Sequence, residues 1–214
     1  MRTGSAAMKP RSSAKWVSIE RGRQGIMRAR IEHDTIKGCT PAMMRWWIEN
    51  LASTSTWDGE GFGGPAIPLY QYWHHHDHIS VTAAGDGRGF AVGDICVVRE
   101  LLNQTGKAVE THVLTDRLDD TGWDFRIKMH GVTVGHVIHH FGPDADGSGL
   151  RFYVESRIGL TTPIIGWLMN WLIVPRFYSR RDAENWILHN VEETGQSERV
   201  IPPIYAEHCA PVPA

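Results

Sequence analysis

The hydrophobic pattern predicts a short helix, then a run of strands, then a long C-terminal helix. The long helix is expected to begin at Ser179, which can cap free amides, with Asp182 at the reciprocal capping position. Gly195 is a residue that commonly ends helices, so we predict that this helix stops there. The short helix is expected to begin at Pro41, directly after the capping residue Thr40.

Between these helices, apolar and polar residues alternate in short runs bounded by turn residues, which is typical of strands. The predicted strands are residues 94–102, 108–115, 123–129, 132–141 and 150–158, and another run at 25–31 precedes the first helix. Residues 103–107 have the composition of a hairpin connection. This order predicts an α+β fold in which a curved antiparallel sheet grips the long C-terminal helix.

Residues 163–174 form the most apolar segment of the chain. Pro163, Asn170 and Pro175 interrupt it, whereas a transmembrane helix needs about 20 uninterrupted apolar residues. We therefore predict a buried wall or lid over a pocket and expect no membrane partner. Contact with a membrane surface is the minority interpretation.

The length of 214 residues fits one domain, which we assign to residues 16–206. Residues 1–15 are small, polar and basic without the apolar core of a secretory signal, so we predict a disordered tail, and residues 207–214 a second tail. A net charge of −2 gives no argument for a nucleic-acid partner. Three widely spaced cysteines without a CxxC motif indicate a reducing compartment, and we predict a cytoplasmic location.

Twelve histidines are a high count, and four of them lie between residues 74 and 78. In an extended chain His74, His76 and His78 would point one way, with His75 and Asp77 pointing the other way. Histidine is the commonest metal ligand, and a neighbouring carboxylate can orient the ring. The tract therefore predicts either part of a metal site or an exposed run that scavenges metal.

Two carboxylates elsewhere are further candidates. On the last helix, His189 and Glu193 share one face, which suits either a divalent cation or an exposed polar pair. In the sheet, a hairpin closing about Thr105 would place Glu100 opposite Glu110. Because a carboxylate among apolar neighbours is costly unless it is paired or binds metal, Glu100 is either a ligand or half of a salt bridge.

Several segments resemble the 2,4-diacetylphloroglucinol hydrolase family, which includes phloretin hydrolase. The resemblance spans residues 25–206 and rests on residues 38–47, Tyr70, Asp77 with His78, residues 186–193 and residues 201–205. It implies a Bet v 1/START-like helix-grip fold and a zinc ion (Zn2+) held by two histidines and two glutamates. It also implies hydrolysis, of the retro-Claisen type, of the carbon–carbon bond between an acyl group and a phenolic ring in a small aromatic ketone.

The resemblance also implies individual roles. The implied zinc ligands are His78, Glu100, His189 and Glu193. Glu110 fits the interval from His78 slightly better than Glu100 does, so it stays open as the alternative ligand.

The implied proton carrier is His139, with its neighbour His140 as the alternative. Tyr70 and Tyr153 are the residues expected to hydrogen-bond the phenolic oxygens. A homodimer is left open.

Two competing functions share this fold or this chemistry. A non-catalytic carrier of hydrophobic or aromatic ligands needs a cavity but has no use for an inward carboxylate beside two histidines. Another metal-dependent enzyme acting on phenolic ketones, such as a decarboxylase or an oxygenase, would use the same ligands with different chemistry.

Overall fold

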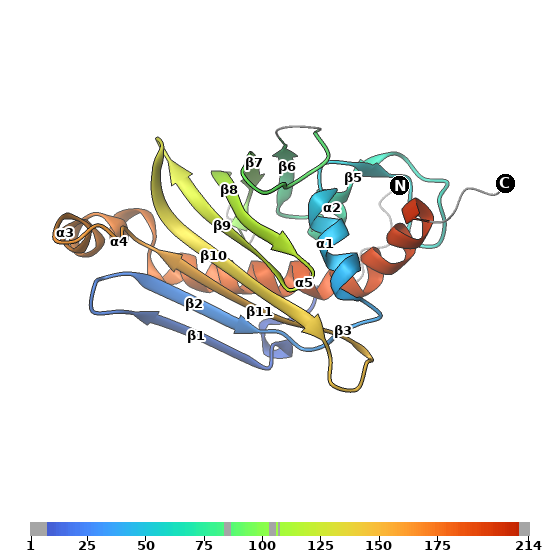
Figure 1. Ribbon diagram of the computed structural model, residues 1–214, viewed down its shortest axis with the longest axis horizontal. Helices are drawn as coiled ribbons and strands as arrows, with labels where there is room; N and C mark the ends of the chain where they lie inside the picture. Colours follow the sequence, from blue (N-terminus) through green and yellow to red (C-terminus); the bar gives the residue numbers. More distant parts are fainter. Residues whose placement is uncertain (1–7, 84–86, 103–105, 107, 210–214) are drawn as a thin grey trace.

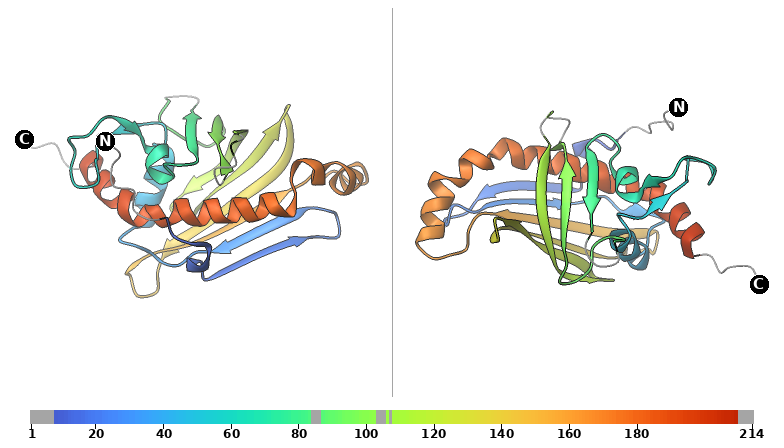
Figure 2. Two further views of the ribbon diagram at one scale, coloured as in Figure 1. Left: turned by 180° about the vertical axis from the view of Figure 1, so that it is seen from behind. Right: turned by 90° about the horizontal axis from the view of Figure 1, so that it is seen from above.

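The computed structural model describes residues 8–83, 87–102, 106 and 108–209. A nine-stranded antiparallel sheet curves around one long helix, α5 (Arg180–Cys209), as Figures 1 and 2 show. This arrangement confirms the α+β helix-grip fold predicted from the sequence.

The sheet follows the order β1-β2-β11-β10-β9-β8-β7-β6, with β3 paired to β11. Its strands are β1 (Trp16–Arg21), β2 (Met27–Glu32), β3 (Ile36–Lys37), β6 (His78–Thr82), β7 (Ile95–Glu100), β8 (Val109–Asp119), β9 (Gly122–Met129), β10 (Val132–Pro143) and β11 (Gly149–Ile158). The remaining elements are a 3-10 turn (Arg11–Ser13), the strand pair β4 (Thr54–Ser55) and β5 (Ile67–Pro68), and the helices α1 (Pro41–Glu49), α2 (Leu69–Trp73), α3 (Ile165–Leu172) and α4 (Val174–Phe177).

Strand β2 shows why the sheet holds α5. Its residues alternate between the two faces, and Met27, Ala29 and Ile31 form one buried cluster with Ile187 and Val191 of α5. Every second residue of β2 therefore packs against the apolar stripe of α5, in which residues recur with a period of 3.6. This contact excludes water from both surfaces.

The start of α5 agrees with the prediction, and its end does not. Ser179 and Asp182 form the reciprocal cap, because the Ser179 amide donates to Asp182 Oδ2 at 2.7 Å and the Asp182 amide donates to Ser179 Oγ at 3.3 Å. The helix continues through Gly195, where a Cβ atom would lie 2.8 Å from the Lys9 side chain. Gly195 therefore permits a close approach of the chain instead of ending the helix.

Residues 201–205 are helical as well, although their two adjacent prolines disfavour a helix. Pro202 and Pro203 lie inside α5, which changes direction toward its C-terminal end (Figure 1). Val200, Ile201 and Ile204 are fully buried in the main core, so tertiary packing offsets the hydrogen bonds that the prolines cannot make.

The N-terminal stretch differs from the predicted disordered tail. Lys9 pairs with Glu198 at 2.6 Å, and the Gln196 amide approaches the Met8 sulfur at 3.1 Å, so residues 8–15 lie against α5. Residues 1–7 lie outside the described part of the chain. At the other end, helix α5 takes in 207–209 of the second predicted tail, and residues 210–214 are outside the description.

The apolar segment 163–174 is not the buried wall or lid that we predicted. It forms α3 and the start of α4, which project from one end of the molecule with most of their large side chains exposed (Figure 1). Within the described residues, no helix is both long and apolar enough to cross a membrane.

The packing of α5 on β2 can be tested by truncating Ile187, which is fully buried. We expect Ile187→Ala to lower the free energy of unfolding by about 3 kcal/mol, because it removes buried methyl groups and leaves a cavity. The neighbouring Leu188 is half-buried, so Leu188→Ala is the matched control with an expected loss under about 1 kcal/mol. Urea denaturation of both variants measures the difference, and equal losses would contradict this account.

Candidate metal centre

Three separate parts of the chain meet at one point: the histidine tract, the end of β7 and helix α5. The histidine tract forms a turn between α2 and β6 instead of an extended run, and it buries His74, Asp77 and His78 while leaving His75 and His76 exposed. Strand β7 ends at Glu100, which pairs in register with His78 at the start of β6. These residues face one stretch of α5.

From α5, the side chains of His189 and Glu193 reach the same point, one helical turn apart. His189 Nε2 lies 3.2 Å from His78 Nε2, 3.6 Å from Glu100 Oε2 and 3.8 Å from Glu193 Oε2. Glu193 Oε2 also lies 3.3 Å from His78 Nε2. The four residues proposed as ligands on sequence grounds are therefore together in space.

Hydrogen bonds at the far ring nitrogens fix how the two imidazoles face this point. His78 Nδ1 is 2.6 Å from the Tyr70 carbonyl oxygen, and His189 Nδ1 is 3.0 Å from Asp77 Oδ2. Both acceptors lack a proton, so each Nδ1 carries the hydrogen and donates it. In neutral rings, both Nε2 lone pairs then point at each other and at two carboxylates.

Such a group of electron-rich atoms repels itself unless a cation or shared protons lie among them. Zinc bonds of about 2.0–2.2 Å to nitrogen and oxygen in a tetrahedron would separate neighbouring ligand atoms by about 3.4 Å. The distances of 3.2–3.8 Å bracket this value. The donor set and its spacing thus fit a zinc ion.

The pKa shifts show that burying these ionisable groups together is costly when only protons can neutralise their charge. Burial and, after it, the charge of the neighbouring His189 lower the pKa of His78 to about 3. Burial also raises the pKa of Glu193 to about 7. Burial alone would lower the pKa of His189, but the hydrogen bond to Asp77 and the charges of Glu100 and Glu193 outweigh it and raise the pKa to about 9.

Polar residues that hydrogen-bond the proposed ligands hold them in place. Asp77 is fully buried and orients His189. His74 accepts from the Asp77 amide at Nδ1 (3.1 Å), so its Nε2–H donates to Glu192 Oε2 (3.1 Å). Asn190 donates its amide to Glu193 Oε1 at 2.7 Å. The sequence pointed to Asp77 as a carboxylate that orients a histidine ring, but nothing in the pattern marked His74 and Glu192 as a pair.

His74, Asp77 and His189 form another close triplet of possible ligands. That triplet would use His189 Nδ1, whose hydrogen is already donated to Asp77, and His74 Nε2, which is bonded to Glu192. We therefore assign it to the support of the first group.

Tyr70 contacts two of the proposed ligands, His78 and Glu100. Its ring stacks on His78 with 3.7 Å between centroids, and its hydroxyl donates to Glu100 Oε2 at 3.0 Å. Burial, followed by the charges of Glu100 and Glu193, raises the pKa of Tyr70 well above its ordinary value. The hydroxyl therefore keeps its proton and acts as a donor.

The structure separates the two candidate glutamates of the sheet. Glu110 pairs with Arg99, not with Glu100, because the register of β7 and β8 is shifted by one residue from the predicted hairpin. A shift of one residue turns the side chain to the opposite face. Glu110 is exposed beside Arg99 and His112, so Glu100 is the glutamate at the centre. Residues 103–105 and 107 of the predicted connection lie outside the description.

His139 faces the interior but lies away from the four-residue group, on β10. Its ring stacks on Trp123 at 4.9 Å, and its Nδ1–H donates to the Trp123 carbonyl at 2.8 Å. Burial lowers its pKa to about 4. Burial also lowers the pKa of a second interior histidine, His33, to about 3.

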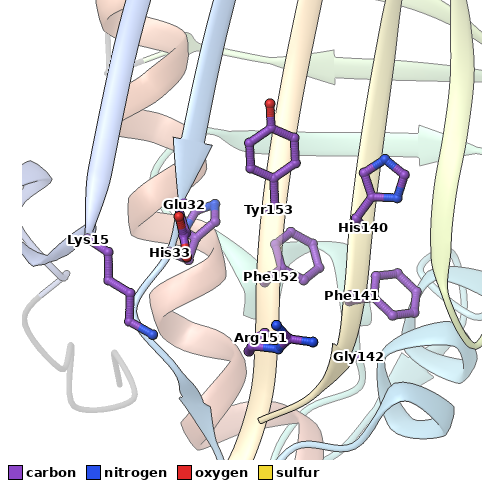
Figure 3. A pocket seen from close by; sticks show the side chains of 9 residues that line it. All are labelled: Lys15, Glu32, His33, His140, Phe141, Gly142, Arg151, Phe152 and Tyr153. Atoms are coloured by element: carbon purple, nitrogen blue, oxygen red, sulfur yellow. The ribbon is translucent and has the colours of Figure 1, made fainter. Parts of the chain in front are cut away.

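The structure does not bring Tyr153 or His140 to the centre. Both point to the face of the sheet away from α5, where Figure 3 shows them beside a pocket of about 220 Å³. Tyr153 donates to Glu155 Oε2 at 3.2 Å, and its neighbours Phe152 and Val154 are the residues that face the core. Tyr153 thus cannot contact a substrate at the centre, and of the two histidines only His139 faces inward.

Neither a family model nor a curated protein matches this sequence. Among solved structures, the KanY protein is similar at 11% identity over 79% of this chain and 95% of that chain, with a TM-score of 0.41. A polyketide cyclase-like protein of Corynebacterium glutamicum is similar at 13% identity, covering 88% and 98% with a TM-score of 0.39. Human STARD10 is similar at 7% identity, covering 92% and 83% with a TM-score of 0.37. The likeness is to the fold alone.

Burial of the neutral His139 makes stability depend on pH. Its pKa is about 4 in the folded state against about 6.5 when unfolded, so its contribution is present above pH 6.5 and is lost as the pH falls toward 4. We expect the loss of unfolding free energy between pH 7 and pH 5 to be smaller by about 2 kcal/mol in His139→Gln. The matched control is His140→Gln, on the outer face. Urea denaturation at both pH values measures the loss of stability. An equal loss in the two variants would contradict this account.

Proposed function

We propose that this protein is a zinc-dependent hydrolase that cleaves the carbon–carbon bond between an acyl group and a phenolic ring. The observation that carries the proposal is the cluster of two buried imidazoles and the buried Glu193 carboxylate at 3.2–3.8 Å, with the half-buried Glu100 carboxylate 3.6 Å from His189. The finer part, the acyl-phenol substrate, rests on the resemblance of the motifs around these residues to the phloroglucinol hydrolases.

The donor set favours zinc among the common divalent cations. Two neutral imidazoles and two carboxylates give a neutral site with a doubly charged ion, and this mixture of nitrogen and oxygen ligands suits zinc, with Fe²⁺ and Mn²⁺ as competitors. Neutrality matters because His78, His189 and Glu193 are buried, where a net charge is costly.

When bound, the zinc ion would supply a Lewis acid that polarises the acyl or phenolic oxygen and acidifies a water. In the overall reaction, a water oxygen bonds to the acyl carbon and the bond from that carbon to the ring breaks. The electron pair stays with the ring carbon, which takes a proton, and the acyl group leaves as a carboxylic acid. The chain must therefore hold the ring and supply or direct one proton.

Tyr70 and His139 are the residues that we propose for these tasks. Tyr70 keeps its proton and lies against Glu100, so its hydroxyl can turn to a phenolic oxygen close to the ligands. His139 is neutral above its lowered pKa and holds its Nδ1 proton on Trp123, which leaves Nε2 as the basic nitrogen. We therefore propose it for the proton that the ring carbon takes.

A carrier of aromatic or hydrophobic ligands is the second candidate. Trp47, Trp73 and Trp123 belong to the main core, and aromatic side chains of this kind can enclose apolar ligands. A carrier has no use for four converging charged or basic groups, so metal content separates the two functions.

Metal content gives the first test, with control residues taken from the same stretches. We expect about one zinc per chain in the purified protein and a loss of at least about tenfold in zinc affinity in His78→Ala, Glu100→Gln, His189→Ala and Glu193→Gln. His76→Ala and Glu110→Gln should keep the metal, because both residues are exposed. Elemental analysis after dialysis checks this, and retention of zinc in all four ligand variants would refute the site.

Activity gives the second test, in a screen of acylated phenols that reads carboxylic acid release. We expect Tyr70→Phe and His139→Gln to keep stoichiometric zinc and to lower kcat/KM by about 10²-fold or more, since each removes a hydrogen-bonding or proton-transfer group.

Tyr153→Phe is the control and should leave kcat/KM unchanged, because Tyr153 faces away from α5. Bound zinc without acid release from any acylated phenol would favour another metal-dependent reaction, and tight binding of such phenols without zinc would favour the carrier.

A further inference from the structure

Helices α3 and α4 form an exposed hydrophobic end of the molecule, which we call the apolar tip. Its members are Ile164, Ile165, Trp167, Leu168, Trp171, Leu172, Ile173 and Phe177, with exposed fractions from 36% to 83%. They lie within 14 consecutive residues and project from one end of the fold (Figure 1). Contiguous exposed apolar surface of this kind marks a contact with another apolar phase or molecule.

Helix α3 is amphipathic in the reverse of the usual sense. Its two buried residues are Gly166 and Asn170, the smallest and the most polar of the helix, while Trp167, Leu168 and Trp171 face outward. A helix that had only to pack on this protein would bury its large apolar side chains. The orientation therefore indicates that the outward face has a partner.

Specific contacts hold α3 in this orientation. The fully buried Asn170 side chain donates to the Gln24 and Leu160 carbonyls at 3.0 and 2.9 Å and accepts from the Leu160 amide at 2.7 Å. Arg21 donates to the Asn170 carbonyl at 3.1 Å and lies 5.8 Å from the Trp171 ring centroid. The turn before β2 comes so close that a Cβ at Gly25 would lie 2.8 Å from Asn170.

The surroundings of the tip are basic. Residues 156–181 contain four arginines and no aspartate or glutamate, and one of the four, Arg157, pairs with Glu155 at 2.6 Å. Arg176 and Arg181 are exposed beside α4, and Arg23 is exposed on the β1–β2 turn that packs against α3. Arg180, also exposed, pairs with Glu184 at 3.3 Å. The apolar side chains are thus flanked by positive charge, whereas the whole chain has a net charge of −2.

We propose that the apolar tip docks on the surface of a membrane that contains anionic lipid. Tryptophan and branched aliphatic side chains enter the boundary between headgroups and acyl chains, and arginines beside them bind lipid phosphates. A second copy of this chain fits less well, because a two-fold contact through the tip would bring the arginines of both copies together. The inference goes beyond the proposed function and does not depend on it.

Vesicle flotation tests this docking on the full-length protein. We expect it to float with vesicles of phosphatidylcholine and phosphatidylglycerol, to bind vesicles of phosphatidylcholine alone far more weakly, and to be released as salt rises. Trp167→Ser should weaken binding by about tenfold. Arg23→Gln should weaken it by about fivefold, the effect of one basic residue near an anionic surface.

Two matched variants remove the same kinds of residue elsewhere. Phe62→Ser takes away an exposed aromatic residue and Lys37→Gln an exposed cation, each away from α3 and α4, and both should bind vesicles as the wild type does.

Equal binding to both kinds of vesicle, or no effect of Trp167→Ser, would overturn the proposal. So would a dimer in sedimentation velocity that Trp167→Ser converts to a monomer, because the tip would then be covered by a second copy. All four variants should keep the zinc content of the wild type, so failure here stays separate from failure of the hydrolase proposal.

Discussion

The hydrogen bond between Asp77 and His189 joins two parts of the chain that are 112 residues apart, and the candidate centre depends on it. It fixes the turn between α2 and β6 against the buried face of α5. The same bond sets the tautomer of His189, so that Nε2 faces His78 and the two glutamates. Both partners are almost fully buried, where a hydrogen bond involving a carboxylate is strong and an unpaired carboxylate is costly.

The fold was predictable because its patterns are local and repeated. The strand runs from residue 94 to residue 158, the Thr40 cap and the Ser179–Asp182 cap all follow from spacing and capping chemistry. The end of α5 was not predictable in this way, since local signals at Gly195 and at Pro202 were overridden by packing. The helix continues past both positions because Val200, Ile201 and Ile204 pack in the core. Their partners in the core lie far away in sequence.

The centre was predictable in its residue types and less so in its geometry. The step from His189 to Glu193 is local to one helix, whereas the choice between Glu100 and Glu110 depended on a hairpin register that no local pattern fixes. Tyr153 shows the same limit, because alternation along β11 decides which face it occupies, and its buried neighbours Phe152 and Val154 take the inner face. For residues 163–174, hydrophobicity predicted burial, but hydrophobicity alone does not say whether the partner of an apolar side chain lies inside or outside the molecule.

Helix α5 also sets a distance. It begins beside α4, close to the apolar tip, and reaches His189 nine residues later, which is about 14 Å along its axis. If the tip rests at the level of the lipid headgroups, the imidazoles lie about 14 Å along α5 from its start, which is about twice the thickness of one headgroup layer. An apolar ligand that left the bilayer would then travel only a short distance to the candidate centre. The length of this part of α5 would then set how far the candidate centre lies from the membrane surface to which the tip binds.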